Sequence, residues 1–299
     1  MLSSLMGRVW KLGRIGIRAP QPEPDRKGVA IVLIVRNEER HIREWAEFHA
    51  LAGARGFFVY DDGSSDRTVP ILRDVLGERL TVVPWRQRLS VPGPGWEIHN
   101  QVLAYAHAAS NFGGAFRWMS FIDADEFLVP KREATIEAAL AHLEDCANVS
   151  LPWHMFGRCG HHVPPEGGIL RNYPRRAADP RREARGVRAF KMVVDPCRLT
   201  VVRVHAMETG DDRTCNDRGE AASFRERERP AFYSADHLQL NHYYSRSEEE
   251  LAAKIGRGPN LAGKASAFER KVRRTLANIE AETVEDRAAL DYLARMGVA

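Results

Sequence analysis

Runs of apolar residues alternate with amphipathic stretches along the first half of the chain. Residues 29–35 are continuously apolar and mostly β-branched, which is typical of a parallel strand buried on both faces. Residues 38–53 follow with apolar positions at helical spacing. Further strands are expected at 57–60, 80–83 and 116–122, and further helices at 66–76 and 98–110. This order predicts an α/β fold with a mostly parallel, twisted sheet flanked by helices.

The second half continues with strands and ends in helices. Ser247 and Glu250 have the spacing of a capping box, so a helix should begin there. We expect strands at 148–156, 190–194, 201–205 and 237–243, a charged irregular segment at 208–235, and two amphipathic helices in 264–299. The chain therefore divides into a leader (1–28), one main domain (29–260) and a C-terminal helical extension (261–299).

The leader is basic and amphipathic. Residues 1–18 carry no acid and interleave basic with apolar side chains, a pattern that can contact a membrane surface. Pro20, Pro22 and Pro24 predict a stiff linker, so the folded domain should begin near Gly28. No run approaches the roughly 18 apolar residues of a membrane span. We expect a cytoplasmic location, with residues 1–18 able to reach the inner face of the membrane.

Composition narrows the class of protein. With 44% hydrophobic and 28% charged residues, the 299-residue chain has the make-up of a globular protein. A net charge of +4 gives no reason to expect a nucleic-acid partner. The four cysteines are widely spaced and form no C-x-x-C pair, so we expect reduced thiols rather than a zinc site or disulfides.

Three polar clusters follow apolar strands. They are Arg36–Glu38 after the first strand, Asp61–Asp62 after the second, and Asp123 with Asp125 after the fourth. Parallel strands end at the same edge of a sheet, so these clusters should meet there. In an extended chain Asp123 and Asp125 would point the same way, and their repulsion favours a bound cation. Mg²⁺ and Mn²⁺ accept such oxygen ligands and keep positions open for phosphates.

These motifs as a set resemble the inverting family 2 type glycosyltransferases with the GT-A fold, which is Rossmann-like. Downstream segments are similar to the branch around glycosyltransferase family 92: residues 153–157, Lys191 before a strand end, and residues 241–244 followed by 247–250. The resemblance covers roughly residues 29–258. It implies a nucleotide-sugar donor, UDP-linked in our expectation, and a glycan or lipid-linked acceptor. It further implies that Arg36, Glu38, Asp61 and Asp62 face the nucleoside and that Asp123 and Asp125 serve ribose and metal.

Sugar transfer from such a donor places specific demands on the site. Negative charge grows on the departing diphosphate, so a metal and basic side chains should stabilise it. Lys191 is expected to clamp the diphosphate because a strand holds it in place. Inversion also needs a general base for the acceptor hydroxyl. Candidates are Glu126, Glu208, Asp211, Asp212 and Asp236, and we favour the 208–212 segment because it leaves a strand toward the acceptor.

A metal needs a further protein ligand, and two histidines end late strands. His205 and His242 are the candidates, since Mn²⁺ accepts imidazole as well as oxygen. His242 has the better context, because Asn241 and the two tyrosines after it could orient its ring. Trp153 could stack on a sugar ring or belong to the core.

Other classes share parts of this pattern. A metal-dependent nucleotidyltransferase would need a glycine-rich loop after the first strand, and residues 33–40 contain no glycine. A non-catalytic carbohydrate-binding protein would not need the Asp61–Asp62 cluster. A dehalogenase-type phosphatase would carry its D-x-D after the first strand. A retaining glycosidase needs two carboxyls about 5–5.5 Å apart, which the D-x-D pair could supply. The full pattern favours a metal-dependent glycosyltransferase.

Overall fold

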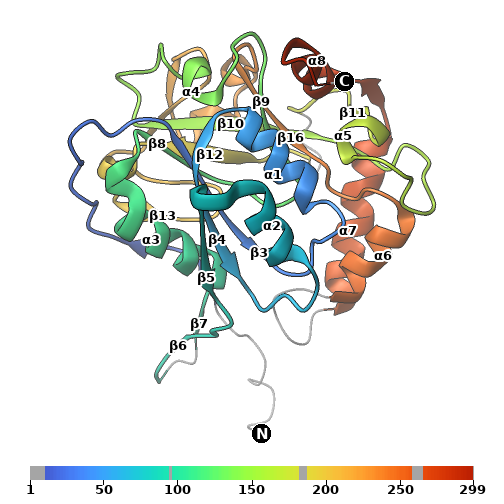
Figure 1. The fold of residues 1–299 in the computed structure, drawn as a ribbon, viewed down its shortest axis with the longest axis horizontal. Helices are drawn as coiled ribbons and strands as arrows, with labels where there is room; N and C mark the ends of the chain where they lie inside the picture. The colour runs from blue at the N-terminus through green and yellow to red at the C-terminus, as the bar shows by residue number, and fades with distance from the viewer. Residues whose placement is uncertain (1–10, 94–95, 182–186, 258–264, 299) are drawn as a thin grey trace, which may run out of the picture.

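The computed structural model describes residues 11–93, 96–181, 187–257 and 265–298 (Figure 1). Its main feature is a sheet with the strand order β15-β14-β10-β12-β8-β3-β4-β5, from which β16 and β9 branch beside β10. The predicted α/β class is confirmed.

The first half of the sheet is parallel and sandwiched between helices. β3 (Val29–Val35) lies between β4 (Ala54–Asp61) and β8 (Trp118–Phe121), and β5 (Leu80–Pro84) extends the sheet beyond β4. Side chains of β3 divide alternately between two cores, as the period of a strand requires. Ile31 and Leu33 pack with α1 (Ile42–Leu51) and α2 (Thr68–Leu76), whereas Ala30 and Val32 pack with α3 (Asn100–Phe112).

The second half of the sheet is mixed. β12 (Phe190–Val194) is antiparallel to both β8 and β10 (Asn148–Met155). β16 (Leu238–His242) is parallel to β10 and antiparallel to β9 (Glu126–Pro130). Parallel pairing, as predicted, is thus continuous in β8-β3-β4-β5 and recurs beside β10, whereas β12 and β9 run antiparallel to their neighbours. The chain reverses direction between β8 and β9, because the turn that joins them is too short for the crossover connection that parallel strands need.

The strand directions create one functional edge. β3, β4, β8, β10 and β16 end there, and β9 and β12 begin there. We call it the site edge. Because β9 and β12 start at this edge, their first residues meet the last residues of the other strands.

Smaller elements complete the fold. They are β6 (Ser90–Val91), α4 (Ile136–Ala139), α5 (Ile169–Asn172), β11 (Arg175–Ala177), β14 (Arg213–Cys215) and β15 (Ala221–Ser223). β14 and β15 lie within the segment that was expected to be irregular.

Residues 11–28 lie against the main domain. β1 (Lys11–Leu12) pairs with β7 (Trp96–Ile98), and β2 (Ile15–Gly16) pairs with β13 (Val201–Val202). Arg26 forms two hydrogen bonds with Asp195, 2.5 and 2.8 Å long. The proline segment therefore packs on the fold instead of forming a separate linker. Residues 1–10, which include most of the predicted membrane contact, lie outside the described residues. Within the described ranges, no helix has the length and apolar character to cross a membrane.

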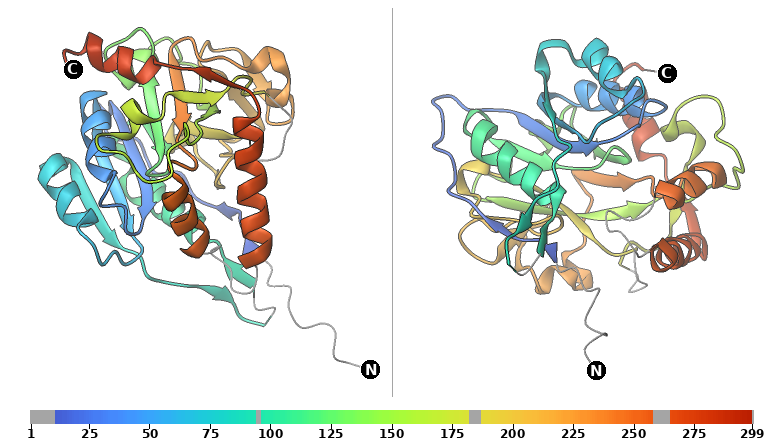
Figure 2. Two further views of the ribbon diagram at one scale, coloured as in Figure 1. Left: turned by 90° about the vertical axis from the view of Figure 1, so that its right-hand side faces the viewer. Right: turned by 90° about the horizontal axis from the view of Figure 1, so that it is seen from below.

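The helices near the end of the chain pack beside the sheet. α6 (Glu248–Arg257) and α7 (Ala265–Glu280) lie side by side, as both views in Figure 2 show. The predicted capping box is confirmed: Glu250 N donates to Ser247 Oγ (3.3 Å) and Ser247 N donates to Glu250 Oε2 (3.1 Å). The two expected tail helices are α7 and α8 (Ala288–Arg295), separated by β17 (Thr283–Glu285), which pairs with β11.

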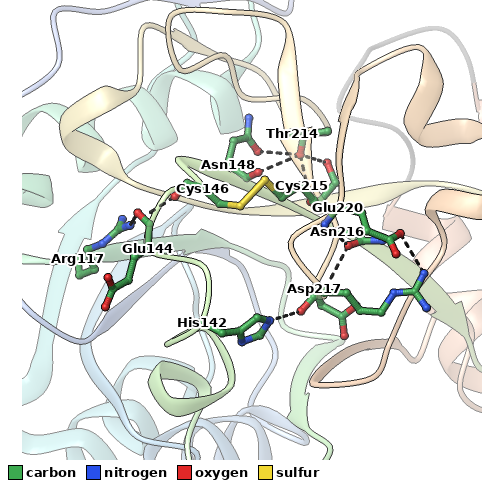
Figure 3. Close-up of a disulfide and its surroundings, with 12 residues drawn as sticks. Arg117, His142, Glu144, Cys146, Asn148, Thr214, Cys215, Asn216, Asp217 and Glu220 are labelled. Atoms are coloured by element: carbon green, nitrogen blue, oxygen red, sulfur yellow. Dashed lines mark hydrogen bonds and ion pairs between the residues drawn. A yellow bond between two sulfur atoms is a disulfide. The ribbon is translucent and has the colours of Figure 1, made fainter.

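One pair of cysteines contradicts the expectation of reduced thiols. Cys146 is disulfide-bonded to Cys215 across 69 residues of sequence (Figure 3). Cys159 and Cys197 are free. β14 brings Cys215 beside Val149, at the start of β10. Linear spacing could not reveal this pairing, since it depends on the sheet order. Disulfides are typical of oxidising compartments, so the cysteines no longer support a cytoplasmic location.

Candidate functional site

The D-x-D motif lies in a tight turn at the site edge. Glu126 N donates to Asp123 O (3.0 Å), which closes the turn between β8 and β9. The motif is therefore not extended, as the sequence analysis assumed, and its two carboxylates have different partners. Asp123 contacts Gln101 and Lys191, whereas Asp125 lies beside His242. A strand that reverses at once into β9 cannot keep both side chains on one extended face.

Asp123 is neutralised by a buried lysine. Its Oδ2 accepts from Lys191 Nζ (2.9 Å) and its Oδ1 accepts from Gln101 Nε2 (2.8 Å). Lys191 is 1% exposed and also lies 3.3 Å from Glu126 Oε2. Burial alone would lower the pKa of Lys191, but the two carboxylates raise it well above its usual value. The geometry thus gives Lys191 the task of holding the D-x-D turn, rather than the direct contact with diphosphate that we expected.

Glu126 is a second support of the turn. Its side chain is 0% exposed. Its Oε2 accepts from Asp123 N (2.8 Å) and its Oε1 accepts from Trp153 Nε1 (2.7 Å). Burial raises the pKa of Glu126, and the Lys191 ammonium opposes that rise. With both oxygens occupied and no exposed surface, Glu126 is not placed to reach an acceptor hydroxyl.

Asp125 and His242 lie together at the end of β16. Asp125 Oδ1 is 3.5 Å from His242 Nε2, and Asp125 Oδ2 is 3.4 Å from Lys254 Nζ. Burial would raise the pKa of Asp125, but the charges of His242 and Lys254 lower it well below its usual range. The expected placement of His242 beside the D-x-D is therefore seen.

The environment of His242 differs in part from the expected one. Its Nδ1 is 3.8 Å from Glu126 Oε1 and, within the described residues, has no hydrogen-bond partner. Asn241 points the other way and donates to Tyr243 Oη (3.3 Å), because neighbouring residues of a strand face opposite sides. Of the residues expected to orient the ring, Tyr244 lies near it, at 5.5 Å between ring centres.

A divalent metal fits at Asp125 and His242 only if groups from outside the protein complete its coordination. A carboxylate oxygen and an imidazole nitrogen suit Mn²⁺. Among the residues that the structure describes, no group of three or more histidines, cysteines or acids could hold a metal. The protein would thus supply two ligands, and phosphate oxygens and water would supply the rest.

Two adjoining clefts meet at the D-x-D turn. The larger has a volume of about 640 Å³ and the smaller of about 240 Å³. Both are lined by Ile34, Val35, Arg36, Gln101 and Asp123. The larger alone is also lined by Glu38, Asp125, Trp153, His205, His242, Arg246, Lys254 and Lys271. The site edge therefore offers one continuous groove with the D-x-D turn at its centre.

The two acids after β4 are placed differently. Asp62 lines the smaller cleft and pairs with both terminal nitrogens of Arg88, each at 2.8 Å. Asp61 Oδ1 accepts from Ser64 N (2.9 Å), so this carboxylate fixes the turn after the strand. Of the two, Asp62 is the one placed to meet a ligand.

Basic residues that the sequence analysis missed line the larger cleft. Arg246 lies 3.3 Å from Glu38 Oε2 and 3.6 Å from Glu250 Oε1. Lys254 donates to Tyr244 O (2.6 Å) and lies 4.0 Å from the centre of that ring. The position of Lys254 could have been predicted from the sequence. The capping box sets the start of α6, and Lys254 lies four residues after Glu250, on the same helical face.

The acids favoured as general base lie elsewhere. Asp211 lines a hollow near Cys146 and Cys215, and Asp212 adjoins it in the chain. Cys215 pairs with Val149, at the start of β10, which is the sheet edge opposite the site edge. The expectation that Asp211 and Asp212 face the acceptor is therefore wrong, because β14 runs along the far end of the sheet.

The other two acids considered are also paired away from the site. Glu208 is paired with Arg14 and Arg203, each at 2.9 Å, and Asp236 lies 3.8 Å from Arg218.

Comparison with known proteins identifies one family over most of the chain. A family model described as glycosyltransferase family 92 matches residues 31–282. A family 92 protein from Ricinus communis is 25% identical over 176 residues, which cover 54% of this chain and 30% of that protein. One from Oryza sativa subsp. japonica is 26% identical over 189 residues, which cover 61% and 30%. The matched part spans less than a third of the length of these relatives.

Some of the solved structures with a likeness to this chain are synthases of sugar phosphoglycerates. Glucosyl-3-phosphoglycerate synthase from Mycobacterium tuberculosis, in complex with Mn²⁺, UDP and glucosyl-3-phosphoglycerate, is 18% identical. The match covers 57% of this chain and 58% of that one, with a TM-score of 0.30. Mannosyl-3-phosphoglycerate synthase from Rubrobacter xylanophilus is 16% identical, covering 56% and 53%, with a TM-score of 0.28. Likeness at this level carries no argument about the site.

Proposed function

This chain belongs to glycosyltransferase family 92, and on that premise we propose that it transfers a sugar from a UDP-linked donor to a hydroxyl acceptor, with a divalent metal and inversion of configuration. The observation that carries this proposal is the continuous groove at the site edge. Its two clefts meet at the D-x-D turn, and Asp125, His242 and Lys254 converge there. A nucleotide sugar has the same order of parts: nucleoside, diphosphate and sugar.

The smaller cleft suits the nucleoside. Asp62, Gln101 and Asp123 line it, together with Arg88. Carboxylates accept hydrogen bonds from ribose hydroxyls, and an amide can donate to a base carbonyl. Arg36 lines both clefts, which supports a role for it at the junction of nucleoside and diphosphate. We assign donor binding to these residues.

The larger cleft suits the diphosphate and the sugar. Bound Mn²⁺ or Mg²⁺, held by Asp125 and His242, would neutralise charge on the leaving diphosphate. Arg246 and Lys254 line the same cleft and add fixed positive charge. Such preorganised charge stabilises the developing anion, because it needs no reorganisation during the reaction.

We assign the acceptor to the part of the larger cleft around Trp153. The Trp153 ring contacts both His205 and His242, with ring-centre distances of 5.2 and 4.4 Å. Trp153 lines the larger cleft, so its surface is available to a sugar ring, as expected for a glycan acceptor. A lipid-linked acceptor is the second form that we propose, with membrane contact through residues 1–18.

The test is a panel of UDP-sugars with Mn²⁺, Mg²⁺ or EDTA, followed by UDP release and by calorimetry with UDP. We expect metal-dependent release from at least one UDP-sugar and metal-dependent binding of UDP. Sugar binding without nucleotide binding would favour a carbohydrate-binding protein. Pyrophosphate release from a nucleoside triphosphate and a sugar phosphate would favour a nucleotidyltransferase. Either result would overturn the proposal.

A further inference from the structure

The larger cleft lacks a carboxylate that is ready to act as a base. Four acids line it, and each already contacts a basic group: Glu38 with Arg246, Asp123 with Lys191, Asp125 with Lys254, and Glu250 with His41. A carboxylate held by a cation is a weaker base, since its ionised form is stabilised. The base of an inverting transfer therefore has to be sought among neutral groups.

His205 is such a group. It lines the larger cleft, and its Nδ1 lies 3.1 Å from Phe190 O. A carbonyl can only accept, so Nδ1 must carry the proton. This hydrogen bond fixes the tautomer and leaves the lone pair on Nε2. Within the described residues, Nε2 has no protein hydrogen-bond partner, and the residue is exposed.

The backbone of His205 is also fixed, by the side chain of Arg227. Arg227 Nη2 donates to His205 O (2.8 Å), and Arg227 Nη1 donates to Ser150 Oγ (2.9 Å). The Arg227 guanidinium lies 4.4 Å from the centre of the Phe190 ring. Phe190 is the same residue whose carbonyl accepts from His205. A buried guanidinium thus fixes both the backbone of His205 and the strand that orients its ring.

We propose that His205 is the general base of the reaction. Its Nε2 takes the proton of the acceptor hydroxyl while that oxygen forms a bond with the anomeric carbon. The bond from this carbon to the phosphate oxygen breaks, and its electron pair leaves with the nucleoside diphosphate. The imidazolium then releases its proton to water. This inference rests on the proposed function. It also implies that the neighbouring Trp153 ring binds the acceptor.

The charged and titratable groups around His205 are Lys191 on β12, Asp123 in the D-x-D turn and His242 on β16. Asp123 and Lys191 are paired with each other. Burial and the charge of Lys191 lower the pKa of His205 to about 4, against the smaller opposing effects of the Phe190 carbonyl and Asp123. The imidazole is therefore neutral near pH 7, as a general base must be before it accepts a proton.

The experiment compares His205→Ala and His205→Asn with wild type and with His162→Ala, a control at an exposed histidine paired with Glu248. The Asn amide can still donate to Phe190 O but cannot serve as a base. The assay is UDP release from the UDP-sugar panel with water as acceptor, at saturating Mn²⁺. We expect both His205 variants to lose about 10²–10⁴-fold in kcat, with UDP affinity unchanged. Imidazole should restore part of the rate in His205→Ala. The wild-type rate should fall at low pH, as Nε2 becomes protonated, and that limb should be lost in both variants.

The outcomes separate this inference from the proposed function. Wild-type rates in both His205 variants, or an unchanged pH profile, would overturn the assignment while leaving the transferase intact. Activity retained in His205→Asn alone would show a positioning role. A shifted Mn²⁺ requirement in His205→Ala would make it a metal ligand. If wild type turns over no UDP-sugar, the proposed function fails and the base assignment falls with it.

Discussion

Lys191 Nζ lies 2.9 Å from Asp123 Oδ2, although 68 residues separate them in the chain. β12 starts at the edge where β8 ends, and this antiparallel pairing brings the cation to the D-x-D turn. Lys191 → Met should therefore leave Asp123 and Glu126 without their cation. Breaking a buried ion pair on one side costs about 3–5 kcal/mol, and we expect a loss of that order in the free energy of unfolding, measured in urea.

Lys131→Met is the matched control for that measurement. Lys131 Nζ donates to the neutral Gln239 Oε1 (3.1 Å), so its loss should cost only about 1 kcal/mol. Equal losses in the two variants would show that the buried network at the D-x-D turn contributes no more than an ordinary hydrogen bond.

Asp125 is the acid of the D-x-D motif that lies beside His242 and Lys254 in the larger cleft. Asp125→Ala should reduce metal-dependent UDP-sugar turnover by at least about 10²-fold, because the metal and Lys254 lose their shared carboxylate. The circular dichroism spectrum should be unchanged. Asp291→Ala, on the distant helix α8, serves as the control and should keep full turnover. A wild-type rate in Asp125→Ala at saturating Mn²⁺ would remove the D-x-D motif from the mechanism.

His242 is predicted to share the metal with Asp125. His242→Ala should raise the Mn²⁺ requirement by about 10-fold or more, since ligands and their supports typically change metal affinity by 10–100-fold. Binding can be followed without turnover by the paramagnetic resonance of Mn²⁺ in the presence of UDP. His205→Ala should leave that titration unchanged. Overlay of the His242→Ala and wild-type curves would mean that His242 is structural.

Asp62 and Asp61 should differ in their effect on the donor. Asp62→Ala should weaken UDP binding by about 1.5–3 kcal/mol if its carboxylate accepts a hydrogen bond from the nucleoside. Asp61→Ala should leave affinity nearly unchanged and lower stability by about 1 kcal/mol, because its partner is Ser64 N. Calorimetry with UDP distinguishes the two. Unchanged affinity in both variants would place the nucleoside away from this turn.

The sequence predicted the parallel half of the sheet well because burial on both faces leaves a strong local pattern. β3 is apolar throughout, and its end marks where Arg36 must lie. His242 could also be placed, since β16 alternates and then stops. The roles of Lys191 and Glu126 could not be predicted. Both depend on antiparallel strands whose order is set by tertiary packing. In addition, the sequence around a charged residue does not show whether that residue is buried or exposed.

The same reason explains the wrong assignments. Asp211 and Asp212 were expected at the acceptor because a strand precedes them, but nothing local says at which edge of a sheet a short strand such as β14 lies. Arg246 and Lys254 were overlooked because charged residues after a strand and on an amphipathic helix usually face water. They line the larger cleft because the start of α6 and the residues just before it form part of its wall.

The disulfide makes a last prediction about the edge opposite the site. Cys146 and Cys215 enclose a loop of 69 residues, and the loss of loop-closure entropy in the unfolded chain corresponds to about 4 kcal/mol. Cys146→Ser with Cys215→Ser should lower the free energy of unfolding by that order, and dithiothreitol should do the same to wild type. Cys159→Ser with Cys197→Ser, at the free thiols, is the control and should not respond in this way. The folded double variant should keep its UDP affinity, because Cys215 pairs with Val149 while His242 pairs with Met155, at the other end of the same strand β10. If neither mutation nor reductant changes stability, the two thiols do not pair in solution, and the cysteines again agree with a reducing compartment.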